Sequence, residues 1–170
     1  MKKIISLAFM MLLAVAPVFA QKLSKEEKAA RAKAQYESAV QCIEGRNFVI
    51  VPTQYMDSDN VLQTNNDNSR FFSCEGKQFF IQGAICGGDN NTPYVAEDTE
   101  YTVTKDKKGN IKLRILVNGR KVRGTYTISV RTSGNFADVI YTPPTGSVRK
   151  FSGPLVPVKE ANYNKRSNPM

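Results

Sequence analysis

The chain has 170 residues and a formal net charge of +9; 41% of its residues are hydrophobic and 23% are charged. This length suits one domain with short appendages, and the composition is that of a globular protein rather than a disordered or fully membrane-embedded one. The chain contains no histidine, which excludes every mechanism that needs an imidazole as general base, proton shuttle or metal ligand.

Residues 1–20 have the pattern of a secretory signal peptide. Lys2 and Lys3 precede an apolar run at residues 4–16. The compact residues Val18 and Ala20 then occupy the positions three and one before a cleavage point between Ala20 and Gln21. A retained membrane helix would need a longer apolar run to cross about 30 Å of hydrocarbon. We therefore expect a soluble exported protein, periplasmic or extracellular, that does not span a membrane after cleavage. Removing both lysines lowers the net charge from +9 to +7, and positive charge outside the cytoplasm favours anionic partners over nucleic acid.

Residues 21–45 are predicted to contain one amphipathic helix. Ser24 and Glu27 have the spacing of a capping box at its start, and Gly45 stands where a left-handed C-cap residue belongs. Its apolar positions recur at spacings of three and four, and therefore share one face: Ala29, Ala32, Tyr36, Val40 and Ile43. Because that face is mostly alanine, which buries little area, we expect the helix to pack on its own sheet rather than on a membrane.

From residue 46 to residue 158 the apolar residues recur with a period of two, which predicts an antiparallel β domain. A polar loop at residues 57–69 precedes four turn signals: Glu75-Gly76, residues 107–110, Asn118-Gly119 and Ser133-Gly134. The Asn-Gly pair is the strongest of these signals, because both residues tolerate the positive φ of a type I′ turn.

Two of these turns predict which residues face each other across neighbouring strands. A two-residue loop at Asn118-Gly119 gives these pairs: Ile115 with Val122, Leu113 with Gly124, Ile111 with Tyr126 and, on the wet face, Arg114 with Arg123. The Ser133-Gly134 turn gives a second set in the same way: Tyr126 with Tyr141, Ile128 with Val139, and Val130 with Ala137. The apolar members share one face, as in an antiparallel sheet with one wet side.

The hairpin that turns at Gly76 differs, because both of its faces are apolar. Its predicted pairs are Phe72 with Phe79 and Phe71 with Phe80, on opposite faces. Both faces must be covered, and the N-terminal helix is the expected cover for one of them.

Together these elements predict a mainly β fold. We expect a curled antiparallel meander of about seven or eight strands, either a half-open barrel or sandwich-like, with the N-terminal helix packed on it. The polar residues 159–170 are expected to form a flexible tail.

Several segments carry a family resemblance. The helix ends in Gly-Arg-Asn-Phe-Val at residues 45–49, and the first hairpin reads Phe-Phe-Ser-Cys-Glu-Gly at residues 71–76. Residues 101–110 read Tyr-Thr-Val-Thr-Lys-Asp-Lys-Lys-Gly-Asn, and residues 151–157 read Phe-Ser-Gly-Pro-Leu-Val-Pro. The chain resembles the domain-of-unknown-function family 4251, small exported proteins of gut-type Bacteroidetes, over nearly all of its expected mature length. The resemblance implies export, and it brings no activity or catalytic residues with it.

The three cysteines are Cys42, Cys74 and Cys86. An oxidising compartment favours pairing, but an odd number leaves at least one cysteine outside any intramolecular disulfide. Cys74 and Cys86 cannot bridge within the predicted hairpin, because about 30 Å of strand separates them and a disulfide spans about 6 Å. Cys42 could reach either one. The favoured interpretation is three partly buried thiols, and the close spacing of a zinc or redox site is missing.

Basic residues are concentrated between residues 105 and 123, where eight lysines and arginines accompany one acidic residue. The predicted register places four of them on one wet face, and these are the candidate anion-binding residues: Lys112, Arg114, Lys121 and Arg123. The alternative is an ordinary solvated sheet face that discourages edge pairing.

These features favour a non-enzymatic binding module for an anionic envelope component or a small amphiphile, without cofactor or metal. The alternative is a structural, envelope-associated domain that meets other proteins through its sheet edges. An unrecognised hydrolase ranks third. Ser147 and Lys150 match the S-x-x-K of penicillin-recognising enzymes, but they follow a turn into a strand and the partner motifs are absent.

Overall fold

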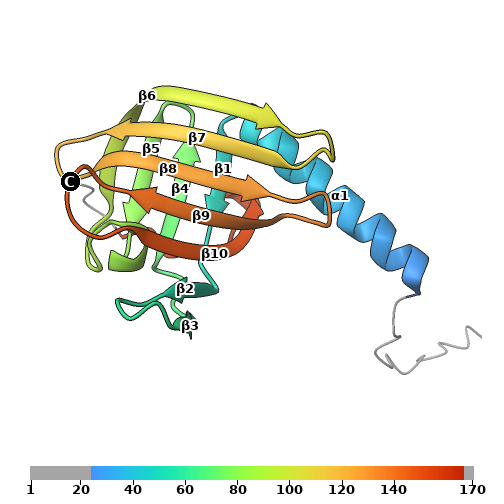
Figure 1. The fold of residues 1–170 in the computed structure, drawn as a ribbon, viewed down its shortest axis with the longest axis horizontal. Coiled ribbons are helices and arrows are strands. Elements are labelled where there is room, and N and C mark those ends of the chain that lie inside the picture. The colour runs from blue at the N-terminus through green and yellow to red at the C-terminus, as the bar shows by residue number, and fades with distance from the viewer. Residues whose placement is uncertain (1–23, 167–170) are drawn as a thin grey trace, which may run out of the picture.

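The computed structural model describes residues 24–166 (Figure 1). One helix is followed by strands and two short 3₁₀ turns, in this order: α1 (Lys25–Glu44), β1 (Asn47–Ile50), β2 (Gln54–Met56), β3 (Leu62–Thr64), β4 (Phe71–Glu75), β5 (Gln78–Gln82), η1 (Ala84–Cys86), β6 (Tyr94–Lys105), β7 (Ile111–Asn118), β8 (Arg123–Val130), β9 (Phe136–Thr142), β10 (Arg149–Val156) and η2 (Val158–Glu160). The signal-peptide prediction for residues 1–20 lies outside the described residues.

The strands form an antiparallel barrel that closes on itself. Neighbouring strands follow the order β1-β4-β5-β6-β7-β8-β9-β10, and β1 returns to β10 through the pairs Val49–Val156 and Ile50–Leu155. The β2–β3 hairpin extends the sheet beyond β10, below the barrel in Figure 1. The prediction of a curled, mainly β meander with one helix is therefore confirmed, and the sheet is a closed barrel rather than a half-open one or a sandwich.

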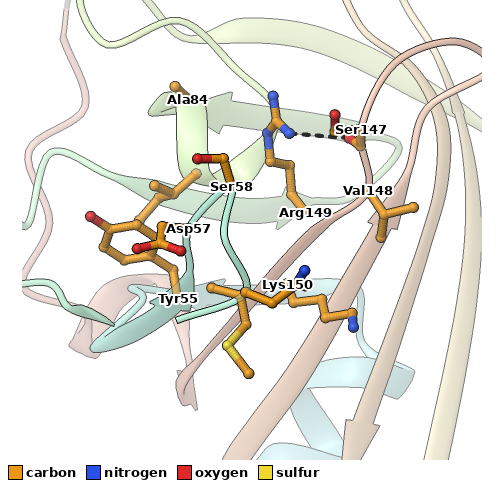
Figure 2. A pocket seen from close by; sticks show the side chains of 11 residues that line it. Tyr55, Asp57, Ser58, Ala84, Ser147, Val148, Arg149 and Lys150 are labelled. Carbon is orange, nitrogen blue, oxygen red and sulfur yellow. Dashed lines mark hydrogen bonds between the residues drawn. The ribbon is translucent and has the colours of Figure 1, made fainter. Parts of the chain in front are cut away.

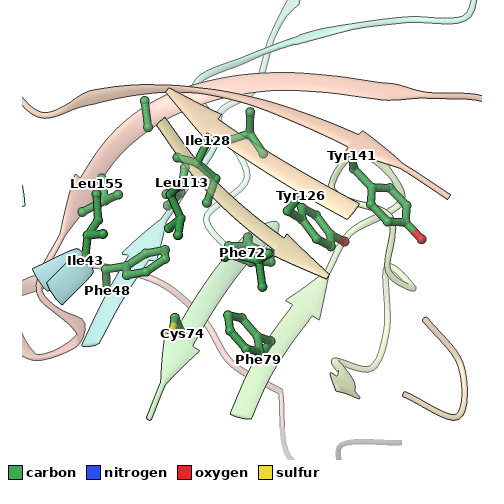
Figure 3. Close-up of a cluster of buried hydrophobic side chains, with 14 of the residues drawn as sticks. Ile43, Phe48, Phe72, Cys74, Phe79, Leu113, Tyr126, Ile128, Tyr141 and Leu155 are labelled. Carbon is green, nitrogen blue, oxygen red and sulfur yellow. The ribbon is translucent and has the colours of Figure 1, made fainter. Parts of the chain in front are cut away.

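Side chains fill the interior of the barrel (Figure 3). The ring of Tyr126 stacks on that of Tyr141 with centroids 4.4 Å apart, and Phe72 lies 4.4 Å from Tyr126 on its other side. Strands β7, β8 and β9 alternate strictly between the interior and the surface, as the period of two predicted. The interior is thus a packed core.

The helix begins and ends at the predicted residues, but the residue that follows its end does not take the predicted left-handed conformation. Ser24 and Glu27 form the capping box. Gly45 has a right-handed backbone with φ −78°, and Arg46 takes the left-handed conformation instead, with φ +51°. That conformation is held in place from outside the helix, because the guanidinium of Arg46 makes two hydrogen bonds of 2.9 and 3.0 Å to Asp98.

The helix packs on the barrel with its C-terminal half. Ala39, Cys42 and Ile43 join the main core, and the hydroxyl of Tyr101 donates a 2.6 Å hydrogen bond to the carbonyl of Ile43. Ala29 is exposed, and the first turns run out beyond the strands in Figure 1. The predicted apolar face is therefore used only over its second half.

The predicted register of the β8–β9 hairpin is confirmed, and that of the β7–β8 hairpin is wrong. In the latter, Ile115 faces Tyr126 rather than Val122. The turn has four residues, closed by a 2.8 Å hydrogen bond from the amide of Gly119 to the carbonyl of Val122. Gly119 is required there for close packing, since a Cβ would clash with the carbonyl oxygen of Val95 on β6.

The first hairpin is also shifted, by two residues, and its turn lies at Gly76 and Lys77. Both shifts are even, so each side chain keeps its predicted face. Phe72 and Phe79 lie in the main core, and Phe71 and Phe80 form a second, outer cluster.

The cover of this outer cluster is not the helix. Residues 158–166, expected to belong to a flexible tail, lie across β4 and β5, where Val158, Ala161 and Tyr163 pack on the outer cluster. The prediction of a loose tail is wrong as far as Arg166, because the apolar outer face needs a cover that the helix does not supply.

Candidate functional site

The four predicted anion-binding residues lie at two separate places on the barrel. Lys112 and Arg114 point outward from β7, whereas Lys121 lies in the β7–β8 turn and Arg123 begins β8. All four are exposed. The β7–β8 turn is longer than the two residues that the prediction assumed. Arg114 therefore faces Thr127 across the sheet, and the predicted pairing of Arg114 with Arg123 is wrong.

One of the two cations on the β7 face already has a partner. Arg114 forms an ion pair with Glu100 on β6, and this hydrogen bond lowers the pKa of Glu100 because it favours the ionised carboxyl. Both side chains are more than a third exposed, so water screens the pair and it contributes little to stability. The β7 face therefore carries less uncompensated charge than its sequence indicates.

A second group of polar and charged residues lines a surface hollow of about 700 Å³. Three segments that are distant in the sequence meet there: the β2–β3 hairpin, η1 and the start of β10 (Figure 2). Its volume lies within the range of small-molecule binding sites. The polar side chains that line it are Tyr55, Asp57, Ser58, Asn60, Ser147, Arg149 and Lys150.

One wall of the hollow is shaped by Asp57. One oxygen of its carboxylate accepts hydrogen bonds from the amides of Asp59 (3.0 Å) and Val61 (2.9 Å), and the other accepts one from the side chain of Gln63 (2.8 Å). These hydrogen bonds, that from Val61 first, lower the pKa of Asp57. This carboxylate is therefore occupied in folding its own loop.

Another wall is the η1 segment, which is fixed to the barrel at two points. The hydroxyl of Tyr126 donates a 2.8 Å hydrogen bond to the carbonyl of Cys86. Gly87 has a left-handed φ of +92° and lies so close to the ring of Tyr141 that a Cβ there would clash with it. The wall that carries Ile85 is therefore held in one position.

Two basic residues at the start of β10 face this space. Arg149 and Lys150 both line the hollow, although they are consecutive on the strand. Figure 2 shows the guanidinium of Arg149 between Ser58 and Ser147, and it donates a 3.3 Å hydrogen bond to the carbonyl of Ser147. Within residues 24–166, no carboxylate forms an ion pair with either cation. The hollow thus offers positive charge and hydroxyl groups together.

Sequence reasoning missed this arrangement. Ser147 and Lys150 stood out only as a rejected enzyme motif, and the structure places Ser147 in a loop that leads into a strand. Tyr55 reaches the same site because it pairs with Phe151 across β2 and β10. No spacing in the sequence signals a contact between segments so far apart.

The described residues hold no group of three or more histidine, cysteine, aspartate or glutamate side chains arranged for a metal ion. Cys42, Cys74 and Cys86 are buried and free of disulfides, as the favoured interpretation predicted. Burial raises the pKa of Cys74 to about 12, so its thiol is neutral near pH 7 and a poor nucleophile. No helix in the described part of the chain is long and apolar enough to cross a membrane.

The fold can be compared with known proteins. No family model matches the chain, and no curated protein matches it in sequence. Among solved structures, it is similar to the crystal structure of a DUF4251 family protein from Bacteroides eggerthii DSM 20697, with a TM-score of 0.67 and 18% sequence identity. The match covers 79% of this chain and 95% of that one. This likeness shows the fold. The similar structure is of a protein from the family that the sequence motifs of this chain resemble.

Proposed function

We propose that this protein is an exported, non-enzymatic binding module whose hollow binds a small amphiphile with an anionic head group. The observation that carries this proposal is the environment of Arg149, whose guanidinium has no carboxylate partner within the described residues and lies between Ser58 and Ser147. A guanidinium presents forked donors that suit carboxylate and phosphate oxygens, and the hydroxyls of the two serines can add further hydrogen bonds.

Apolar side chains in the same hollow favour an amphiphile over a bare ion. Met56, Ile85 and Val148 line it, and Met56 and Val148 are 37% and 47% exposed. An apolar tail that covers these side chains removes their surface from water, which is favourable.

Export of the protein is supported by the signal-peptide pattern of residues 1–20 and by the family resemblance. An anionic envelope component is the natural partner class in that setting. Lys112, Lys121 and Arg123 are exposed elsewhere on the barrel, and their positive field raises the local concentration of anions.

A binding role fits the residues of the hollow better than catalysis does. The chain contains no histidine. Among the described residues that line the hollow, the one carboxylate is that of Asp57, which is already engaged by two backbone amides and Gln63. A serine hydroxyl needs an adjacent base to act as a nucleophile.

The proposal can be tested by calorimetric titration of the purified full chain with monomeric dihexanoyl phosphatidylglycerol and dihexanoyl phosphatidylcholine. We expect the anionic lipid to bind with one molecule per protein, and the zwitterionic lipid to bind at least tenfold more weakly. Rising salt should weaken binding of the anionic lipid. The double change Arg149→Gln and Lys150→Gln should reduce affinity at least tenfold.

The matched control is Arg114→Gln with Arg123→Gln, which removes the same charge from the surface predicted from the sequence. This variant should bind nearly as wild type does. The opposite ranking of the two variants would place the site on the outer sheet face. If the wild type binds neither lipid at low salt, the proposed ligand class is wrong.

A second candidate function, protein interaction through a sheet edge, is favoured by β3. This strand pairs only with β2, so its outer edge lacks a neighbour among the described strands. Val61 just before it and Leu62 at its start are 52% and 56% exposed, and an open edge with apolar side chains is a template for another strand. Sedimentation velocity would test self-pairing: the wild type should associate with rising concentration, and Leu62→Lys should stay monomeric. A wild type that is monomeric throughout would contradict self-pairing.

A further inference from the structure

The outer faces of β1, β4 and β5 carry a second apolar cluster that is separate from the barrel core; the surface that it forms beneath residues 158–166 is called the groove below. Its floor is apolar: Val49 and Phe71 are fully buried and Phe80 is 8% exposed. These side chains point away from the barrel interior, and they are covered by Val51, Val95 and the segment that crosses them. That segment is residues 158–166, called the strap below.

The strap begins with the 3₁₀ turn η2 and continues as an extended segment that belongs to no strand. Residues 161–166 have neither helical nor strand structure, and their burial alternates, with Ala161, Tyr163 and Lys165 partly buried and the residues between them exposed. Alternation of this kind is how an extended peptide presents every second side chain to a surface.

An aromatic side chain forms the first anchor of the strap. The ring of Tyr163 meets that of Phe71 edge to face, with centroids 4.8 Å apart and an angle of 67°. Burial raises the pKa of Tyr163, and the charge of Glu75 raises it further. Its hydroxyl therefore stays protonated beside that carboxylate.

A lysine two residues further on forms the second anchor. The ammonium of Lys165 lies 2.9 and 3.1 Å from the two oxygens of Glu75 and 3.1 Å from the centroid of the Phe80 ring. A cation held by both a carboxylate and an aromatic face is recognised through charge as well as shape.

The third anchor is a side chain that forms hydrogen bonds with the backbone of the strap. Gln82 on β5 is fully buried; its amide nitrogen donates to the carbonyls of Ser69 (2.6 Å) and Asn164 (3.3 Å), and its oxygen accepts the amide of Arg166 (3.2 Å). A carboxamide carries a donor and an acceptor like a peptide group, so it can pair with alternate backbone groups of any extended segment. Without an occupant, this buried amide would lose two of its three hydrogen bonds.

We propose that this groove is a docking site for extended polypeptide segments with an aromatic residue and a lysine two positions apart, and that the strap occupies it as an internal ligand. An aromatic contact, a charged contact and backbone pairing together are the means by which peptide-binding surfaces hold extended ligands. Apart from the local bond from the amide of Ala161 to the carbonyl of Val158, direct backbone pairing between residues 161–166 and the rest of the described chain is limited to one bond, from the amide of Asn164 to the carbonyl of Asn68. The strap can therefore leave without breaking the sheet.

The test uses the full chain with the strap weakened by Tyr163→Ala and Lys165→Ala. A fluorescein-labelled peptide of the wild-type residues 157–166 is titrated and its anisotropy measured. The variant should bind this peptide saturably at one to one, whereas the wild type, with its groove filled, should bind it at least tenfold more weakly. A peptide carrying the same two alanines should also bind the variant at least tenfold more weakly.

The matched control is Lys159→Ala with Glu160→Ala, two exposed changes in the same segment. It should behave like the wild type. Adding Glu75→Lys to the weakened chain should abolish binding of the wild-type peptide, and a peptide with Lys165→Glu should restore it. If the folded variant binds no peptide, the groove is only a packing surface and the proposal is wrong.

Hydrogen exchange on the wild type keeps the proposal testable even if the weakened chain does not fold. The amides of Asn164 and Arg166 should exchange at least a hundredfold faster than those of β5, because the strap opens by itself. Exchange of strap amides only through global unfolding would overturn the proposal.

Discussion

The hydroxyl of Tyr126, at the centre of the barrel, donates a 2.8 Å hydrogen bond to the carbonyl of Cys86, which lies in the wall of the hollow. Tyr126 is fully buried, and burial raises its pKa well above the ordinary value. The hydroxyl therefore remains a donor throughout the physiological pH range. This one bond couples the packed core to the position of η1.

Tyr126→Phe should destabilise the fold by about 1–3 kcal/mol, because it leaves the carbonyl of Cys86 buried without its donor. Urea unfolding at pH 7 measures the change. The control is Tyr55→Phe, whose hydroxyl makes no hydrogen bond with the described residues; its free energy of unfolding should change by less than about 0.5 kcal/mol. Equal losses in both variants would show that the Tyr126–Cys86 bond contributes nothing specific.

Ile115→Ala should cost about 2–5 kcal/mol of unfolding free energy, since Ile115 is fully buried in the barrel interior. Val103→Ala serves as the control, because Val103 lies on the neighbouring strand β6 but is 40% exposed. That change should stay within about 0.5 kcal/mol. A small loss for Ile115 would mean that the inner and outer faces of β7 are exchanged.

The stability of the fold should fall as the pH rises above about 9. Burial raises the pKa of Cys74 from 9.0 to about 12 and raises the pKa of Cys86 as well. The unfolded chain then loses thiol protons that the folded chain keeps, so the stability that is complete below pH 9 is lost progressively towards pH 12. Each such thiol lowers the free energy of unfolding by about 1.4 kcal/mol between pH 8 and pH 10.

Replacing Cys74 with alanine should remove its share of this pH dependence. Urea unfolding of both proteins at pH 8 and pH 10 should show a loss about 1.4 kcal/mol smaller in the variant, whatever its stability at pH 8. Identical losses would mean that Cys74 ionises as easily when folded as when unfolded.

The exported protein should begin at Gln21. The compact residues before it and the apolar run of residues 4–16 direct cleavage after Ala20. Intact-mass measurement of protein recovered from the envelope or medium of a producing cell decides this point. A mass that includes residues 1–20 would contradict cleavage.

The sequence predicted correctly which side chains of the strands point inward, but it did not predict every register between neighbouring strands. The shift in the β7–β8 hairpin follows from Gly119, which packs against Val95 on β6. That contact links the β7–β8 turn to β6, which is not one of the two strands that the turn joins, so the turn residues alone could not reveal it. Ile115 and Val122 are nevertheless both buried, because an even shift keeps every side chain on its face.

The candidate site was less predictable than the fold. Arg149 and Ser58 come together only because β10 pairs with β2, and β2 belongs to a hairpin outside the barrel. Their composition is ordinary for surface loops, and neither segment has a motif that points to the other. By contrast, the sequence did predict that Lys112 and Arg114 share the outer face of one strand, because they are two residues apart.

The closed barrel constrains the order in which its strands can pair during folding. Val49 in the first strand must meet Val156 in the last one, so the ring has two bare edges until almost the whole domain is available. The strands between can form hairpins early, since each pairs with its sequence neighbour from β4 onward. Because contacts between segments so far apart in the sequence form slowly, we expect closure to be the slow step of folding. Until then the edges of β1 and β10 are open to strands from other chains.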